Sequence, residues 1–295
     1  MVRKTDNLRQ AIKNKNDEFY TLYGTIEKEM PYYIKHFEDK IIYCNCDNPY
    51  KSNFVKYFIN NFNKFKLQAL VSTYYSNNDT VYKTIISNVP EGISDLDELL
   101  KLEGNIKVSL KGNGDFRSEE CINILKQCDI IITNPPFSLY RDFINVVMKY
   151  NKNFIVLAPI TTTVYKNVFP YIRDNKIRLG VTIRGKATNF TGEYGEHKQI
   201  RNIEWFTTLN HNFMSEPIKL VKSYNKEEYP FIDNYDDVIN INKVKDIPKD
   251  YNGLIAVPIS YIYKHNSEQF KIVDYEVNPF VNGVNIFKRI IIQKI

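Results

Sequence analysis

The sequence has few of the residues that build metal centres and disulfide frameworks. Its 295 residues include 4 cysteines and 4 histidines, and the histidines are scattered. Cys44 and Cys46 form a C-x-C pair, while Cys121 and Cys128 lie far along the chain, which is a spacing that matches no common zinc pattern. We therefore expect buried, reduced thiols, a cytosolic compartment and no bound metal.

Long apolar stretches and a strong excess of one charge are also missing. No run approaches the roughly 20 apolar residues that a transmembrane helix needs, and the N-terminus shows no apolar core of a signal peptide. We therefore expect a cytoplasmic protein without a membrane partner. The net charge of +6 is mild, so it permits a polyanionic partner without requiring one.

Apolar runs of strand length alternate with segments of helical periodicity. This pattern predicts an α/β protein with a doubly wound, mostly parallel sheet. After about residue 210 the alternation fades, which suggests a smaller, mixed C-terminal region. Ser52 and Ser118 are expected as N-caps. The expected strands are 40–46, 67–75, 81–87, 106–110, 129–133, 154–159, 177–183 and 203–208, and the expected helices are 52–65, 96–102, 118–127, 139–150 and 164–173.

The strand expected at 129–133 ends in Asn134-Pro135-Pro136-Phe137. Two prolines exclude both a sheet ladder and a helix, so Asn134 is expected on a stiff turn at the carboxyl end of the strand. Ligands of open α/β sheets bind at that edge. The tetrapeptide resembles the catalytic motif of amino-methyltransferases, which methylate a planar exocyclic amine. The alternative is a proline-rich turn that closes a core strand.

The chemistry of such an amine explains the four residue types. Its lone pair is delocalised into the ring, so the nitrogen is a poor nucleophile. The Asn134 side-chain oxygen and the Pro135 carbonyl oxygen can each accept a hydrogen bond from the amine and aim its lone pair at a methyl donor. Pro135 and Pro136 fix the direction of that carbonyl. Phe137 can stack on a base swung out of a duplex.

Three other segments fall where a cofactor site would need them. Residues 46–54 form a strand-to-helix turn whose amides could hold a carboxylate, or else a tight turn with an N-cap. Residues 114–116 offer an Asp to an adenine amino group and a Phe to its ring face, or else a surface turn. Residues 16–21 precede an amphipathic segment and, taken alone, favour a helix entry over a cofactor contact.

Taken in order, these segments resemble the EcoRI-type adenine-specific DNA methyltransferases. The stretches that carry the resemblance are NDEFYT, IIYCNCDNPYKSNFVKYF, LKGNGDFRSEECINIL, CDIIITNPPFSLYRDFI and RNIEWFT. The resemblance implies a class I methyltransferase fold, S-adenosyl-L-methionine as cofactor, double-stranded DNA as substrate and a bacterial or phage origin. It also implies transfer of a methyl group to the N6 amine of a flipped adenine. The implied cofactor residues are Phe19, Tyr20, Thr21, Asp47, Asn48, Pro49, Phe54, Asp115 and Phe116.

Two features depart from the usual methyltransferase pattern. A glycine-rich loop is replaced by Asp47-Asn48-Pro49-Tyr50, although this replacement matches the EcoRI-type family. The strand expected at 67–75 ends without the acidic residue that often binds the ribose hydroxyls. Thr73 or Tyr74 can take this role, and Thr73 is assigned to the cofactor site.

The resemblance implies an order in which target recognition follows the catalytic motif. We expect a basic arm at 1–15, a catalytic domain at 16–210 and a recognition region at 211–295, with an earlier start near 184 left open. A frayed, solvated end is the alternative for the arm. A partner restriction endonuclease acting on the same site is a further implication. The candidate DNA-binding residues are Arg3, Lys4, Arg9, Arg184, Lys186, Lys198 and Arg201.

Two other classes of function stay open at this point. An amino-methyltransferase could act on RNA adenine or on a protein glutamine, because those enzymes also use an Asn-Pro-Pro-aromatic motif. A catalytically inactive DNA-binding protein could share the fold. The long region after the catalytic motif favours a DNA substrate, and the intact Asn134-Pro135-Pro136-Phe137 motif favours activity.

Overall fold

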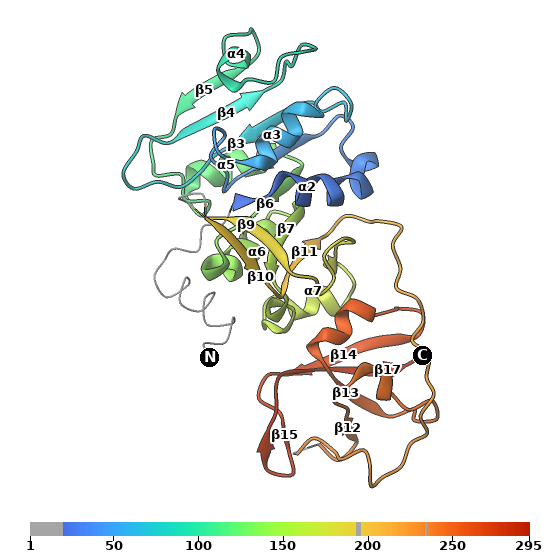
Figure 1. Ribbon diagram of the computed structural model, residues 1–295. Coiled ribbons are helices and arrows are strands. Elements are labelled where there is room, and N and C mark those ends of the chain that lie inside the picture. The colour runs from blue at the N-terminus through green and yellow to red at the C-terminus, as the bar shows by residue number, and fades with distance from the viewer. Residues whose placement is uncertain (1–19, 193–195, 234) are drawn as a thin grey trace. The chain divides into compact units, whose positions relative to one another are not determined.

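The computed structural model describes residues 20–192, 196–233 and 235–295, and the chain divides into two compact units (Figure 1). Unit 1 comprises the described residues up to Pro159 together with Gly180–His211. Unit 2 comprises Ile160–Leu179 and Asn212–Ile295. Unit 2 is therefore built from two separate segments of the chain, and the later part of unit 1 lies between them in sequence. Phe19, Arg3, Lys4 and Arg9 lie outside the described residues.

A large mixed sheet forms the centre of unit 1. Its four middle strands, in the order β3, β2, β6 and β7, are parallel, and antiparallel strands flank them on both sides. No helix separates β3 from β4, and a connection without a crossover joins antiparallel neighbours. In spatial order these strands are β5 (Ile106–Ser109), β4 (Tyr82–Ile86), β3 (Ala69–Ser72), β2 (Ile41–Cys44), β6 (Ile130–Thr133), β7 (Asn153–Pro159) and β11 (Ile203–Thr207).

Four helices of unit 1, α3, α4, α5 and α6, lie within the expected ranges, whereas the helical segment at 23–36 was not among the expected helices. Ser52 and Ser118 are confirmed as N-caps: the Ser52 hydroxyl accepts from Phe54 N and Val55 N, and the Ser118 hydroxyl accepts from Cys121 N. The helices are α2 (Tyr23–Glu29), α3 (Asn53–Asn60), α4 (Leu96–Leu99), α5 (Glu119–Gln127) and α6 (Tyr140–Lys149), with 3-10 turns η1 (Met30–His36) and η2 (Phe137–Leu139).

Alternate residues of β2 contact different helices. Ile42 and Cys44 belong to the same buried cluster as Phe54 and Phe58 of α3. Tyr43 points the opposite way, and its pKa is raised well above the usual value by burial and then by the nearby Cys121 thiol of α5. Both faces of β2 are therefore covered, which explains why the strand reads as a continuous apolar run.

The order of the parallel strands reverses between β2 and β6. The chain runs from β2 outward through β3 and then returns to place β6 on the other side of β2. The carboxyl ends of two strands on either side of such a reversal diverge and leave a crevice for a ligand. Asn45 follows one of these strands and Asn134 follows the other.

A small three-stranded sheet, which the sequence did not predict, completes unit 1. Strand β9 lies in its middle and pairs antiparallel with both neighbours. One neighbour is a two-residue strand from the start of the described chain, and the other follows β9 in sequence. The strands are β1 (Tyr20–Thr21), β9 (Thr188–Thr191) and β10 (His197–Ile200).

Unit 2 contains a four-stranded sheet in the order β12, β13, β17 and β14. Its core includes Ile232, Val238, Ala256 and Ile291. The helix expected at 164–173 is shorter than predicted, since only Phe169–Arg173 is α-helical and a 3-10 turn, Ile160–Val164, precedes it. The elements are η3 (Ile160–Val164), α7 (Phe169–Arg173), β8 (Arg178–Leu179), β12 (Val238–Asn240), η4 (Val244–Asp246), β13 (Leu254–Pro258), η5 (Ile259–Lys264), β14 (Phe270–Glu276), β15 (Phe280–Val281), β16 (Val284–Asn285) and β17 (Arg289–Lys294).

Within the described ranges, no helix is long and apolar enough to cross a membrane. The same part of the chain holds no group of three or more His, Cys, Asp or Glu side chains that could bind a metal ion. Its four cysteines are free thiols, of which three are buried and Cys46 is half-buried.

Candidate functional site

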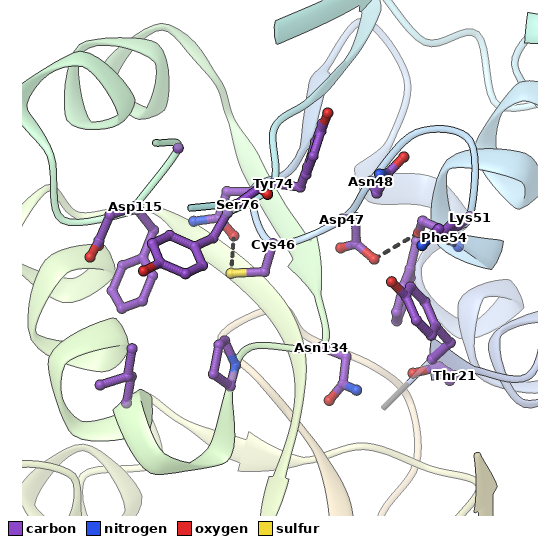
Figure 2. Close-up of a pocket in the computed structure, with 18 of the residues that line it drawn as sticks. Thr21, Cys46, Asp47, Asn48, Lys51, Phe54, Tyr74, Ser76, Asp115 and Asn134 are labelled. Atoms are coloured by element: carbon purple, nitrogen blue, oxygen red, sulfur yellow. Dashed lines mark hydrogen bonds between the residues drawn. The ribbon is translucent and has the colours of Figure 1, made fainter. Parts of the chain in front are cut away.

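A cavity of about 420 Å³ opens at the carboxyl ends of β2, β3 and β6 in unit 1. Its size falls in the range of pockets that bind small molecules and cofactors. Figure 2 shows Asp115 at one side, Thr21 and Lys51 at the other, and Asn134 between them in this view. The wall combines residues from four of the segments that the sequence singled out: Tyr20, Thr21, Asp47, Asn48, Phe54, Asp115, Phe116, Asn134 and Pro136.

Asp47 connects three structural elements beneath this cavity. Its Oδ1 accepts a hydrogen bond from Ser52 Oγ at 2.7 Å, and its Oδ2 accepts one from Thr133 Oγ1 at 2.5 Å. Its backbone N–H donates to the Thr73 carbonyl at 2.9 Å. The carboxylate thus ties the turn after β2 to the N-cap of α3 and to the last residue of β6. Since Thr133 directly precedes Asn134, this network also fixes the backbone position of Asn134.

Burial raises the pKa of Asp47 to about 6, although the hydrogen bonds from Thr133 and Ser52 oppose that rise. The side chain is nearly inaccessible, with a relative exposure of 6%. Removing a carboxylate from water disfavours its charged form. Asp47 can therefore exchange a proton close to neutral pH, which is unusual for an aspartate.

The Asn-Pro-Pro-Phe segment places two of its four residues in the cavity wall. Asn134 and Pro136 line the cavity and are half-buried. Pro135 is buried behind them. The Phe137 side chain belongs to the buried hydrophobic cluster, with a relative exposure of 5%, and Phe137 begins the 3-10 turn η2. Its ring is packed in the core in this conformation.

Asp115 and Phe116 form the opposite end of the cavity and are held by Arg117. The Arg117 guanidinium donates to Asp115 Oδ1 at 3.0 Å and Oδ2 at 2.7 Å, and its third nitrogen pairs with Asp142 at 2.9 Å. These hydrogen bonds lower the pKa of Asp115. The guanidinium also lies 5.5 Å from the centre of the Phe116 ring. Asp115 is therefore an ionised, oriented acceptor beside an aromatic face.

Tyr20 and Thr21 bring strand β1 to the wall beside α3. The Asn53 side-chain amide donates to the Thr21 carbonyl at 2.8 Å, which fixes the strand against the start of the helix. Thr21 Oγ1 is buried and has no hydrogen-bond partner among the described residues. A buried hydroxyl in a cavity wall is suited to a bound polar ligand, because leaving it unpaired costs free energy.

Lys51 supplies a positive charge to the cavity wall near the turn after β2. We expected the amides at the start of the helix at 52–65 to hold a carboxylate, but the Ser52 hydroxyl already accepts from Phe54 N at 3.1 Å and Val55 N at 3.4 Å. Lys51, an exposed residue, lines the cavity at this point and makes no ion pair with another described residue. An ammonium group is thus present where a carboxylate would need a partner.

Comparison with known proteins identifies the family of this chain. Residues 7–294 match the sequence profile described as adenine-specific methyltransferase EcoRI. The chain belongs to this family. No solved structure matches it.

Three relatives show how much of the enzyme is shared. The chain is 39% identical to the type II methyltransferase M.EcoRI of Escherichia coli, over 99% of this chain and 98% of the relative. It is 34% identical to M.MgeORF184P of Mycoplasma genitalium, over 98% of each protein. It is 33% identical to M.MpnI of Mycoplasma pneumoniae, over 92% of this chain and 86% of the relative. The similarity therefore covers both units of the methyltransferase.

Two predicted cofactor residues lie behind the cavity wall of the enzyme. Pro49 is buried in the turn after β2. Thr73 is fully buried, and its hydroxyl lies 2.7 Å from the hydroxyl of Tyr43. Because the Thr73 carbonyl also accepts from Asp47, this residue positions the site rather than lining it.

The predicted DNA-binding residues that the structure describes differ in their surroundings. Lys186 and Arg201 are exposed. Lys198 pairs with Glu196 at 2.8 Å. Arg184 is half-buried and donates to the Gly180 carbonyl at 3.1 Å, and burial lowers the pKa of its guanidinium. Arg184 is thus held within the methyltransferase fold in this conformation.

Other residues line the cavity that the sequence analysis did not assign to it, among them Lys51, Ser76, Asp79 and Arg117. Each follows the carboxyl end of a strand or lies beside a segment already noted. Asp79 is the most informative, because it supplies a carboxylate after β3, where the expected acidic residue was missing. It sits beyond the strand in the Asn77-Asn78-Asp79 turn, and a search confined to the end of the strand overlooks it.

Proposed function

We propose that this chain is a site-specific DNA methyltransferase that transfers a methyl group from S-adenosyl-L-methionine to the N6 amine of adenine in double-stranded DNA. The observation that carries the proposal is the meeting of Asn134 and Pro136 with Asp115, Phe116 and Thr21 in one cavity wall. A site for a planar amine and a site for an adenosyl group are thereby adjacent. The relatives' names, which are those of type II methyltransferases, support the same conclusion.

The residues of the wall fit the parts of this cofactor. Asp115 accepts hydrogen bonds from the adenine amino group, and Phe116 covers the ring. Asp79 accepts from the ribose hydroxyls. Lys51 pairs with the carboxylate at the other end, next to the buried hydroxyl of Thr21. When bound, S-adenosyl-L-methionine supplies a methyl group on a positively charged sulfur, which is a good leaving group.

The remaining cofactor assignments follow from their places in the turn and strand. Asp47 and Asn48 form the turn beneath the amino-acid end, while Pro49 and Thr73 hold that turn from behind. Phe54 closes the wall from α3. Tyr20 belongs to the same wall, and Phe19 is assigned by its position in the motif. A class I, doubly wound fold is supported by the reversal of strand order between β2 and β6.

The amine of the target base is activated by hydrogen bonds alone. The Asn134 side-chain oxygen and the Pro135 carbonyl each accept a hydrogen bond from the amine. They pull its nitrogen toward tetrahedral geometry and direct the lone pair at the methyl carbon. Because the prolines fix the carbonyl before substrate arrives, little reorganisation is needed in the transition state.

The target adenine reaches this site by leaving the duplex. Extruding a base costs a few kcal/mol, which contacts to the base and the DNA backbone must offset. Phe137 is assigned to stack on the flipped base. Since its ring is packed in the core of the free protein, stacking requires the ring to turn toward the cavity when the base enters.

The DNA-binding surface is assigned to two regions outside the cavity. The arm at 1–15, with Arg3, Lys4 and Arg9, contacts phosphate groups. The recognition region spans 211–295, which corresponds to most of unit 2, with added contributions from the basic segment that starts near 184. A restriction endonuclease that cuts the same unmethylated site is the expected partner in the cell.

The test is to express the chain and its Asn134→Ala variant in cells and to sequence modified bases in their DNA. We expect N6-methyladenine at one defined sequence with the parent chain and none with the variant, while the variant still binds S-adenosyl-L-methionine and unfolds at the same temperature. The variant loses an acceptor that acts mainly in the transition state. Methyl transfer to RNA or protein in place of DNA would contradict the proposal, as would parental turnover by the variant.

A further inference from the structure

The three-stranded sheet of unit 1 has two faces of different character. Residues paired directly across antiparallel strands point to the same face. Thr21 pairs with Phe190, and Phe190 pairs with Lys198, so these three share one face. Phe190 is fully buried in the hydrophobic core, so this face is the inner one. Lys198, which the sequence assigned to DNA, therefore lies on the inner face with its ion pair to Glu196.

The outer face carries polar side chains that the sequence interpretation did not assign. Tyr20 pairs with Thr191, and Thr191 pairs with His197, which gives one row across all three strands. Asn189 pairs with Gln199 in the next row on this face, and the two side-chain amides lie 3.4 Å apart. Asn189, His197 and Gln199 are exposed.

This outer face is continuous with the cavity. Tyr20, at the edge of the first row, is itself one of the residues that line the cavity. The polar rows of β9 and β10 thus extend outward from the wall of the methyl-transfer site.

The chemistry of the face fits duplex DNA. A two-stranded β-ribbon fits the major groove, and Asn and Gln side chains are suited to pair with the N6 and N7 atoms of adenine. Among the described residues, the outer rows carry no carboxylate, since they consist of Tyr20, Thr191, His197, Asn189 and Gln199. Two exposed cations, Lys186 before β9 and Arg201 after β10, flank the same end of the ribbon, because Thr188 pairs with Ile200, and they can contact phosphate groups.

We propose that the outer face of the β9–β10 ribbon, with Asn189, His197 and Gln199, reads base edges of the DNA next to the flipped adenine. The proposal rests on the proposed function, since it names a specificity surface for the same reaction. It differs from the earlier assignment, because Asn189 and Gln199 rather than Lys198 contact the bases.

The experiment uses the full chain and begins by mapping its methylated sequence in genomic DNA. Asn189→Ala, Gln199→Ala and the double variant are then assayed on duplexes that carry the mapped site or single-base-pair changes of it. We expect the preference for the mapped site to fall by about tenfold at one or two base pairs, which is within the discrimination typical of an amide–adenine pair. The affinity for S-adenosyl-L-methionine, measured by calorimetry, is expected to stay unchanged.

Gln68→Ala is the matched control. Gln68 is an exposed glutamine that precedes β3, at the opposite end of the sheet from the cavity. It should keep both the site preference and the cofactor affinity. Gln199→Glu keeps the side-chain shape and adds a negative charge, so it should weaken binding to all duplexes as well as relax the preference.

Two outcomes separate the possible failures. If the parent chain methylates a defined DNA site and the ribbon variants keep its full sequence preference, the ribbon proposal is wrong and the proposed function stands. If the parent chain methylates no DNA, the proposed function fails and this proposal fails with it. Loss of cofactor affinity in the alanine variants would also overturn it, because the ribbon would then act on the cavity rather than on the bases.

Discussion

Two aspartates in one cavity wall have pKa values shifted in opposite directions. Asp47 lies in the turn after β2, and burial raises its pKa to about 6. Asp115 is more accessible, and hydrogen bonds from Arg117 lower its pKa. The residue type is the same, so the difference comes from the surroundings. The first suits a structural group that can accept a proton, and the second suits a permanently charged acceptor for a ligand.

The acceptor role of Asp115 gives a prediction for cofactor binding. Asp115→Ala should weaken the affinity for S-adenosyl-L-methionine by about 1–3 kcal/mol, the usual cost of losing a hydrogen bond to a charged group. Asp142→Ala is the control, since Asp142 also pairs with Arg117 but does not line the cavity. Calorimetric titration of each variant tests this difference. Equal losses in both variants would show that Arg117, rather than Asp115, determines the affinity.

The raised pKa of Asp47 predicts a pH dependence of stability. An unfolded aspartate titrates near pH 3.9, so between about pH 4 and pH 6 the folded protein binds a proton that the unfolded chain has already released. The contribution of Asp47 to stability should therefore decrease as the pH rises through this window, on the order of 3 kcal/mol in total. The Asp47→Asn variant stays neutral at every pH.

Urea denaturation of the parent chain and of Asp47→Asn at about pH 4.5, in the lower part of the window, and at about pH 7.5, above it, measures most of this effect. The free energy of unfolding of the parent relative to the variant should be larger at the lower pH. A difference that stays constant, or that grows with pH, would contradict the assignment of a raised pKa.

At the scale of elements, the strand-to-helix junctions position the site. The hydroxyl of Ser52 caps α3 and also donates to Asp47. The hydroxyl of Ser118 caps α5 by accepting from Cys121 N. The two caps are alike in their effect on their helices, but Ser52 is part of the cavity wall and Ser118 is not.

The two caps therefore provide a matched pair of substitutions. Ser52→Ala and Ser118→Ala should each destabilise the protein by about 1 kcal/mol, as the loss of an N-cap usually does. Ser52→Ala should in addition weaken S-adenosyl-L-methionine binding, because Asp47 loses one of its two hydroxyl partners. Thermal unfolding and calorimetry separate the two effects. A Ser118→Ala variant with equally weakened cofactor binding would refute the distinction.

The sequence predicted the strands and helices of unit 1 well, because each is a local pattern. The capped helix that starts after Ser52 and the strand that ends at Thr133 are clear from apolar spacing and end signals. The sheet of β1, β9 and β10 could not be predicted in the same way. Its first strand has two residues, and its partner lies about 170 positions along the chain, so no periodicity marks the pairing.

The site, too, was predicted only where its residues lie in local motifs. Asn134 and Asp115 were accessible to prediction because each lies in a recognisable motif. The contacts that hold them were not, since the Thr133 bond to Asp47 joins distant parts of the chain and depends on the strand order. The hydrogen bonds from Arg117 to Asp115 join residues two positions apart. Whether such neighbouring charges pair with each other or contact solvent depends on side-chain geometry, which the sequence does not give.

At the scale of the whole molecule, the net charge of +6 favours association with a polyanion. Replacement of Arg3, Lys4 and Arg9 by alanine should weaken binding to all duplexes, because interactions with phosphate carry no sequence information. The plot of log affinity against log salt concentration should flatten by about 0.9 for each phosphate interaction that the substitutions remove. Fluorescence anisotropy at several salt concentrations measures this slope. A weakening confined to the cognate sequence would assign these residues to base recognition.

The division of the chain into two units has a consequence for synthesis on the ribosome. Strand β7 ends at Pro159, but its antiparallel neighbour β11 begins only at Ile203, after the excursion of Ile160–Leu179 into unit 2. Until β11 has been synthesised, one hydrogen-bonding edge of β7 stays unpaired, and unpaired edges of apolar strands are prone to aggregate. Within unit 2, α7 lacks a packing partner for longer, because Phe169 packs on Tyr275 of β14, with their ring centres 4.4 Å apart. We therefore expect the speed of translation between these points to affect the yield of folded enzyme.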